Sequence, residues 1–368
     1  MTDTDREQTC MKNRILSQRS IRLTWLILLF LLSLTCVLSA GLWPFNFFPV
    51  NSAIWNESDN SLSFRKPSIA YIPVLPSNLD TQNGFTIELK IKPLHRYLRT
   101  FPRILSIGTI SEELLAVGQW KSGIVFRAFD SCTGGYNEIG YRGAFSEKRP
   151  VHITLSTGPE GTVIFLDGKA VRKEKRPLLS SNSILNGTVV LANDLSGDHP
   201  WSGEFYYLSI SSGHYTGRNL SDRKPGGDNL IRIDFTRRDE SLTPSNITEL
   251  IVPQRFSPPH RKVLTPFWVD FRLNRRYFAD LILNILGFIP SGLLLGLIFL
   301  HSGLKPWKTL IFTFFILFSV SLCIELSQVT LPTRTSQLSD LILNTTGGLS
   351  GGLLSLWFDK RMNISEYK

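Results

Sequence analysis

Residues 279–294 read ADLILNILGFIPSGLL, and residues 339–354 read SDLILNTTGGLSGGLL. The run Asp-Leu-Ile-Leu-Asn recurs without a change, and a glycine follows three residues later in each copy. Both copies lie in stretches that are otherwise apolar enough for a membrane. Ionisable side chains are costly inside a bilayer and are usually paired or functional there. The repeat therefore predicts two related helices within one membrane bundle.

Four apolar spans are expected to cross the membrane as helices. The first, 21–43, carries no charge from Leu23 onward, and about 20 such residues cross roughly 30 Å of hydrocarbon. A signal peptide cleaved near VLSAG is the alternative, but the length of this span and the later spans favour an anchor. The other three spans form a compact bundle over 278–358, with helices at 278–300, 307–328 and 338–358.

Residues 44–215 change character into short β-rich runs separated by turn signals. In HITLSTGPEGTVIFLDGK (152–169), two alternating strands flank a Gly-Pro-Glu-Gly turn, and Asp-Gly makes the next turn. Many short strands at this spacing predict a β-sandwich or a β-barrel, and about 170 residues suit one such domain. Residues 216–277 are expected to be a basic, proline-rich linker with an interfacial end, and residues 1–20 and 359–368 to be cytoplasmic tails.

The distribution of charge bears on partners and orientation. Net charge is +10, but the basic residues flank the apolar spans instead of forming one patch, so nucleic acid is not an expected partner. Lys12, Arg14 and Arg19 precede the first span and place the N-terminus inside. The expected location is the cytoplasmic (inner) membrane, as a multi-pass protein with both termini inside and the β-domain extracytoplasmic. The lipid bilayer is then the first partner.

Under this topology the two copies of the repeat run parallel, with one return helix between them. On a helix, Asp280 and Asn284 share one stripe with Gly287 and Ser291. The third span and the next loop add further polar groups at the same level. Seven residues are expected to form one polar binding site in the outer leaflet: Asp280, Asn284, Glu325, Gln328, Arg334, Asp340 and Asn344.

This site has a simpler alternative. Asp280 and Asp340 suit the first turn of a helix, where an acid favours the macrodipole, and the asparagines can hydrogen-bond between helices. Arg334 is the one cation among three acids, so we expect it to pair with Asp340 or Glu325.

The order E-x2-Q-x5-R-x5-D-x3-N, from Glu325 to Asn344, resembles the VanZ-like family. So do LNILGFIPSG (283–292) and the first span, which is followed by GLWPFNF (41–47). The resemblance covers about 110 residues in two pieces. It implies a small polytopic envelope protein, in a family with one member associated with low-level teicoplanin resistance, and it implies no reaction.

The β-segment is similar to concanavalin A-like domains of the laminin G type, through FTIELKIKP (85–93), TVIFLDGKAV (162–171) and NDLSGDHPWSGEFYYLSI (193–210). This resemblance implies an all-β jelly-roll sandwich that binds carbohydrate or protein. The VanZ-like pattern on both sides of it implies that the sandwich is inserted between helices one and two. Some relatives are glucanases, which need two carboxylates on one strand face. Here Glu88 and Glu204 stand alone in their runs, so glycoside hydrolysis is not expected and no catalytic residue is assigned.

One loop of the β-segment is a weak candidate for calcium. Asn193, Asp194 and Asp198 offer oxygen ligands, although a polar loop built on Asx turns is the alternative. Trp201 is either a sugar-stacking platform or a core residue.

The combined hypothesis is a cell-envelope protein whose lectin-like domain binds a glycan or another envelope component. The polar site in the bundle senses or acts on a lipid-linked precursor, with a link to glycopeptide resistance. A membrane enzyme is one alternative, with Asp280, Asp340 or Glu325 as acid/base and Arg334 on a phosphate or carboxylate. The cluster lacks histidine and a nucleophile motif, which weakens that reading. A structural anchor that displays the sandwich is the other alternative.

Overall fold

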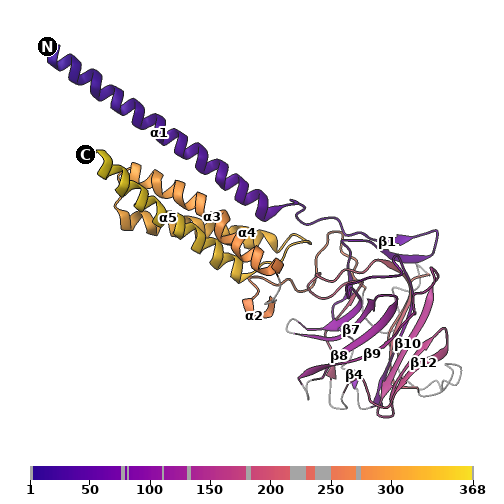
Figure 1. Ribbon diagram of the computed structural model, residues 1–368. Coiled ribbons are helices and arrows are strands. Elements are labelled where there is room, and N and C mark those ends of the chain that lie inside the picture. Colours follow the sequence, from indigo (N-terminus) through magenta and orange to yellow (C-terminus); the bar gives the residue numbers. More distant parts are fainter. Residues whose placement is uncertain are drawn as a thin grey trace. The chain divides into compact units, whose positions relative to one another are not determined.

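The computed structural model describes residues 3–75, 79–80, 83–109, 112–130, 134–179, 184–215, 229–236, 250–270 and 275–366. Its contacts divide the chain into two compact units. One, the sandwich unit, is Phe48–Arg261. The other, the helical unit, joins Met1–Phe47 to Lys262–Lys368 (Figure 1).

The helical unit holds every helix of eight residues or more in the described residues. Its elements are α1 (Asp3–Leu42), α2 (Phe267–Asp270), α3 (Arg275–His301), α4 (Pro306–Gln328) and α5 (Leu338–Glu366). Within the part of the chain that the structure describes, three segments are long and apolar enough to cross a membrane: Ser20–Leu42, Phe278–His301 and Pro306–Gln328. The fourth expected span lies in α5, which is helical but is not among these three.

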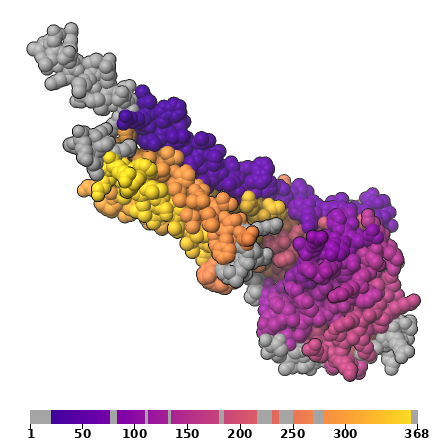
Figure 2. All heavy atoms as spheres, viewed as in Figure 1, coloured from indigo at the N-terminus to yellow at the C-terminus, as the bar shows by residue number. Residues whose placement is uncertain are grey.

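The surface of the helical unit is apolar and its interior is rich in small and hydroxylated residues. Leu32, Leu283 and Phe315 are each about 60% exposed, at 61%, 64% and 60%. Ser291 and Thr313 are almost fully buried. Figure 2 shows residues 20–42 lying along the other helices, and Ser33 Oγ of α1 is 2.7 Å from Ser291 Oγ of α3. This reversal of the soluble pattern fits a bundle surrounded by lipid.

The sandwich unit is built from two antiparallel sheets. In the described residues the first sheet has the order β1 (Ala53–Asn56), β2 (Ser61–Phe64), β15 (Gly203–Ser212), β5 (Phe85–Pro93), β10 (Val151–Gly158), β11 (Gly161–Leu166) and β12 (Lys169–Glu174), with β16 (Asn229–Asp234) paired to β15. The second has the order β3 (Ala70–Ile72), β14 (Thr188–Leu191), β6 (Arg103–Gly108), β7 (Glu113–Trp120), β8 (Gly123–Asp130) and β9 (Gly135–Tyr141). A small pair joins β4 (Leu79–Asp80) to β13 (Ile184–Leu185).

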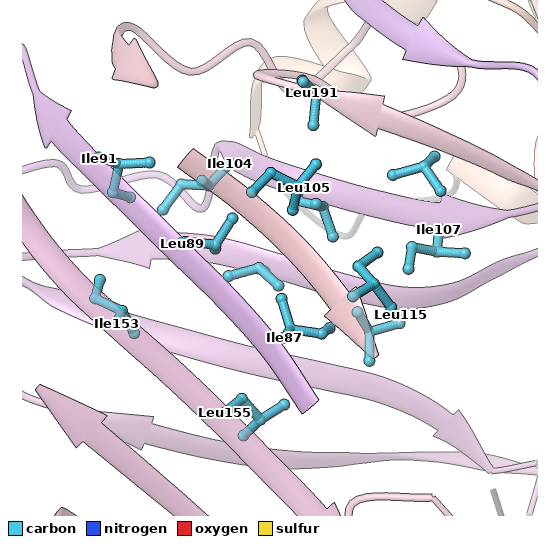
Figure 3. Close-up of a cluster of buried hydrophobic side chains, with 14 of the residues drawn as sticks. Ile87, Leu89, Ile91, Ile104, Leu105, Ile107, Leu115, Ile153, Leu155 and Leu191 are labelled. Atoms are coloured by element: carbon cyan, nitrogen blue, oxygen red, sulfur yellow. The ribbon is translucent and has the colours of Figure 1, made fainter. Parts of the chain in front are cut away.

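The core lies between these sheets. Alternation along β5 points Ile87, Leu89 and Ile91 toward the second sheet, where they meet side chains such as Leu105 and Leu115 (Figure 3). All five of these side chains are fully buried. The alternating hydrophobic runs of the sequence are thus the inner faces of a sandwich, as predicted.

The sandwich extends beyond the boundary expected at residue 215. β16 pairs with β15, with Ser209 opposite Arg232. Leu250 and Phe256, farther along the chain, are also buried, at 8% and 2% exposure. The expected linker, 216–277, is therefore partly sandwich, because short runs such as NLIRIDF find an edge to pair with. Its parts at 216–228, 237–249 and 271–274 lie outside the described residues.

Candidate functional site

The directions of the helices decide which of their ends meet. A Cβ atom on Gly347 would overlap the carbonyl oxygen of Ile285, and one on Gly351 would overlap that of Ile289, so α3 and α5 run parallel. α4 runs antiparallel to α5, since Gly348 packs on Leu317 while Asn344 bonds to Ser321. The N-termini of α3 and α5 therefore lie at the same end as the C-terminus of α4.

The C-terminus of α1 lies at this same end. Gly41 packs against Ile324, and Gln328 Nε2 donates a 2.8 Å hydrogen bond to the Gly41 carbonyl. We call this end of the helical unit, where α1 and α4 end and α3 and α5 begin, the polar end. All seven predicted site residues belong to it or to the turn of helix that follows.

Glu325 is the most buried acid of the polar end. Its residue is only 1% exposed, and its carboxylate accepts a 2.8 Å hydrogen bond from the backbone N–H of Gln337, just before α5. The hydroxyl of Ser336 also hydrogen-bonds to it. Glu325 thus satisfies orphan donors at the start of α5, as a capping acid does.

Asp340, in the first turn of α5, is the centre of a second group. Its side chain lies near Ser339, with 3.4 Å between Ser339 Oγ and Oδ1, and it also hydrogen-bonds to Asn284 of α3. The charges of Asp280 and Arg334 are close enough to act on it, and Asp340 in the same way acts on Glu325. The first turns of both repeat copies thus come together with Glu325.

The three remaining predicted residues hold helices together. Asn344 Nδ2 donates a 3.1 Å hydrogen bond to Ser321 Oγ, between α5 and α4. Gln328 reaches α1 as described above. Arg334 donates from Nε to the Trp43 carbonyl at 3.1 Å and from Nη2 to the Ala40 carbonyl at 2.9 Å.

The expected ion pair of Arg334 is therefore wrong. Among the described residues no carboxylate lies within 4.0 Å of its guanidinium. The last carbonyls of a helix have no partner within the helix, and a guanidinium fork can satisfy two of them at once. The free C-terminus of α1 outcompetes the acids for this side chain.

We expect Arg334→Ala to loosen α1 from the bundle. Two charge-assisted hydrogen bonds disappear, and the loss in the free energy of unfolding should be about 1–2 kcal/mol because the side chain is exposed. Unfolding of the purified protein by sodium dodecyl sulfate would measure it. Lys305→Ala, at the other end of the bundle, is the control, and an equal effect of both changes would contradict the assignment.

Sequence reasoning missed a short clasp at the polar end. The backbone of Thr265 donates to the Ser336 carbonyl at 2.9 Å and accepts from the Leu338 N–H at 3.0 Å. Leu264 N–H adds a bond of 3.1 Å to Ser336 Oγ. Thr265 is 6% exposed, so the segment leaving the sandwich unit is fixed beside Glu325. Backbone pairing of two loops has no side-chain pattern that could have indicated it.

In the sandwich unit, the side-chain oxygens of the loop proposed for calcium accept hydrogen bonds from the loop itself. Asp194 Oδ2 contacts Ser196 Oγ and His199 Nδ1, both at 2.9 Å, and its Oδ1 accepts from Asp198 N–H at 2.8 Å. Asn193 Oδ1 accepts two backbone N–H groups. Among the described residues there is no group of three or more His, Cys, Asp or Glu arranged for a metal. The geometry favours the Asx-turn alternative.

Burial would raise the pKa of Asp194, but the hydrogen bond and charge of His199, with those from Ser196 and Asp198, outweigh it and lower the pKa to about 2. An unfolded aspartate has a pKa of about 3.9, so the folded state binds the proton less readily. The carboxylate therefore contributes stability above about pH 4 that is lost as pH falls toward 2.

We expect Asp194→Asn to remove this dependence and to cost on the order of 2 kcal/mol near neutral pH. Melting of the sandwich, followed by circular dichroism between about pH 2 and 7, measures it. Asp198→Asn, at an exposed neighbour, should retain the wild-type pH profile. Identical profiles for Asp194→Asn and the wild type would refute the account.

The two carboxylates singled out in the sandwich are far apart. Glu204 lies opposite Lys92 of β5. Lys92 and Glu88 are four residues apart on this strand, which places Glu204 and Glu88 about 13 Å apart along it. Glu204 accepts the Tyr206 hydroxyl at 2.8 Å and lies 3.2 Å from Lys92 Nζ, while Glu88 faces His152 at 3.6 Å. Glycoside hydrolases hold their carboxylates about 5–9.5 Å apart.

Fold and site together describe a membrane protein that carries a β-sandwich. The family described as VanZ/LLP1 matches residues 227–359, which include α3, α4 and most of α5. Among curated proteins, none matches the chain. The CBM40 domain of the Ruminococcus gnavus IT-sialidase is similar at a TM-score of 0.32 and 11% identity, over 37% of this chain and 80% of that one. The binding domain of botulinum neurotoxin serotype D is similar at a TM-score of 0.32 and 11% identity, over 45% of this chain and 44% of that one.

Proposed function

We propose that this chain is a multi-pass envelope protein of the VanZ-like type, with a concanavalin A-like sandwich of the laminin G type inserted between the first and second of four crossing helices. The sandwich binds a glycan or another envelope component. The polar end binds the sugar-bearing head of a lipid-linked precursor. The observation that carries this proposal is the group formed by Glu325, Asp340 and Asn284 where the N-termini of α3 and α5 meet.

The chemistry of this group suits a hydroxylated head group. Carboxylates and amides accept hydrogen bonds from sugar hydroxyls, and helix N-termini offer N–H donors to phosphate. Asp280, on the rim, is exposed, whereas Glu325 is 1% exposed. Acids at such positions are costly in a purely structural bundle.

A fourth crossing by α5 is supported by its length and by its exposed apolar side chains, Trp357 among them. From Asp340 to Trp357, α5 rises about 26 Å, close to the thickness of the hydrocarbon layer. Trp25 and Trp307, both exposed, belong to the same end of the bundle as Trp357, as expected for an interfacial belt. The low hydropathy of α5 comes from the glycine and hydroxyl face that packs on α3 and α4.

The orientation with both termini inside predicts a pattern of labelling in intact cells. In a background without the four native cysteines, Glu160→Cys, in the exposed β10–β11 turn, should react strongly with a membrane-impermeant maleimide. Leu304→Cys, between α3 and α4, should not react until the cells are opened. The opposite pattern would reverse the orientation.

The binding proposal is tested with the full-length protein in nanodiscs, using a polyprenyl-diphosphate-linked sugar and the same polyprenyl diphosphate without sugar. We expect the sugar-linked form to bind more tightly. Asp340→Asn and Glu325→Gln should each weaken its binding by about tenfold or more, as for loss of a charged hydrogen bond. Lys305→Gln, outside the polar end, should bind as the wild type does.

A structural anchor is favoured by a specific observation, the use of Gln328, Arg334 and Asn344 as links between helices. An anchor predicts that Asp340→Asn and Glu325→Gln leave binding and resistance to glycopeptides unchanged while display of the sandwich is normal. A glycan array probed with the full-length protein tests the sandwich separately.

A further inference from the structure

The chain enters and leaves the sandwich unit at one place. Asn51 N–H donates to the Gln254 carbonyl at 3.0 Å, and Phe256 N–H donates to the Pro49 carbonyl at 2.8 Å. The side chain of Asn51 also bonds to the Ile69 and Pro253 carbonyls, both at 2.8 Å. We call the end of the sandwich at which this entry and exit lie the basal end.

Strand register places two loops at the basal end. Ala53 follows directly after the entry. It lies in one row across the sheet with Phe64, Gly203 and Pro93, each opposite the next on the neighbouring strand. The loop that follows Pro93 is fixed to the β7–β8 turn, because Leu98 and Lys121 exchange two backbone hydrogen bonds of 3.1 and 2.8 Å.

These loops present aromatic side chains to the outside. Tyr97 is 56% exposed and Trp120 is 46% exposed, and each lies next to one of the bonded residues Leu98 and Lys121. Leu94, at 39%, adds to the same surface. Aromatic residues of this size in a rigid, water-facing loop suggest a function in binding.

The same end is rich in unpaired positive charge. Seven exposed basic residues lie in its loops: Arg65, Lys66, Arg96, Arg99, Lys121, Arg142 and Lys148. In the described part of the chain none of them forms an ion pair, whereas Glu147 of the same end is already paired with Arg149 at 2.7 Å. The surface therefore has a large excess of donors for an anionic partner.

We infer that the basal end is a docking surface for the anionic phospholipid head groups of the bilayer that holds the helical unit. Lysine and arginine bind lipid phosphates, and tryptophan and tyrosine favour the membrane–water interface. Eight residues, 43–50, separate Leu42, the last residue of the first candidate span, from Asn51, so these two residues lie at most about 32 Å apart. This tether holds the basal end near the lipid surface, so the local concentration of lipid head groups is high. A soluble anionic glycan has no such tether and would have to bind from solution.

The experiment uses the full-length protein without its native cysteines, in nanodiscs of phosphatidylcholine alone or mixed with phosphatidylglycerol. Tyr97→Cys carries an environment-sensitive nitrobenzoxadiazole label, and Glu160→Cys, in the exposed β10–β11 turn at the opposite end, is the control position. We expect the label at position 97 to shift to the blue and to be quenched by head-group quenchers only with phosphatidylglycerol. High salt should reverse both effects, and the label at position 160 should not respond.

Charge variants decide whether the basic residues are responsible. Arg99→Gln, Lys121→Gln and Lys148→Gln together should lower the docking equilibrium about a hundredfold, roughly fivefold for each charge. None of these side chains makes a hydrogen bond within the described residues. Lys173→Gln, Lys175→Gln and Arg176→Gln, three exposed cations at the opposite end, should have no effect.

Two results would overturn the inference. One is a response at position 97 that is the same with and without phosphatidylglycerol, including no response in either. The other is an equal response to soluble dextran sulfate in phosphatidylcholine discs, which would assign the surface to an anionic glycan. Neither result depends on binding of a lipid-linked sugar at the polar end, so this inference and the proposed function fail separately.

Discussion

Gly347→Ala is expected to disrupt the bundle, while the same change at Gly287, its counterpart in the repeat, is expected to be tolerated. A Cβ atom on Gly347 would overlap the backbone oxygen of Ile285, and a helix backbone cannot yield as a side chain can. A Cβ atom on Gly287 would meet nothing within 4 Å in the described structure apart from the neighbouring backbone of its own helix. The free energy of unfolding should fall by about 1–3 kcal/mol or more for Gly347→Ala and should hardly change for Gly287→Ala.

The comparison is informative because the two positions share their local sequence and their helix register. Unfolding in sodium dodecyl sulfate and gel filtration of the purified protein would report both stability and assembly. Gly351→Ala should resemble Gly347→Ala, since its added carbon would overlap the oxygen of Ile289. Equal behaviour of Gly287→Ala and Gly347→Ala would mean that α3 and α5 do not pack as described.

Trp201→Ala should be the most damaging single change in the sandwich. The side chain is 0% exposed, donates from Nε1 to Gln119 Oε1 at 3.0 Å, and meets Phe205 edge-on at a centroid distance of 5.6 Å. The truncation should cost about 3–5 kcal/mol and leave the buried Gln119 amide without its donor. Trp201 is thus a core residue, not the sugar platform that its sequence context also allowed.

Thermal melting of the sandwich, followed by near-ultraviolet circular dichroism, measures this loss. Trp201→Phe keeps most of the volume and should cost less, whereas Trp120→Ala, at 46% exposure, should leave the melting temperature nearly unchanged. A Trp201→Ala protein that melts normally but no longer binds a glycan would show that the ring serves a ligand.

The parts of the fold that are periodic in sequence were predictable. The run from Phe85 to Pro93 alternates between core and surface, and β5 has these bounds. The Gly-Pro-Glu-Gly turn joins β10 and β11, which pair from Ile153–Leu166 to Gly158–Gly161. The parallel direction of α3 and α5 was also predictable, because a single return helix lies between the two copies of the repeat.

What the sequence could not predict depends on partners that are distant in the chain. β16 is too short to be recognised until β15 provides an edge, so it was assigned to a linker. At the polar end, sequence spacing alone placed seven polar residues at the same depth in the bundle. It could not tell which of them form a shared polar group and which link one helix to another. Arg334 has acids near it in sequence, yet the carbonyls of Ala40 and Trp43, almost 300 residues away, take its hydrogen bonds.

The clasp at Thr265 makes the connection between the two units mechanically short. Arg261 ends the sandwich unit, and Thr265 is already bonded on both sides to the loop of Ser336 and Leu338. Fewer than five residues of chain are therefore free to stretch on this side. A load on the sandwich, such as attachment to a moving polymer, would pass through that backbone to the peptide that Glu325 holds, so the polar end would experience tension before any helix had to move.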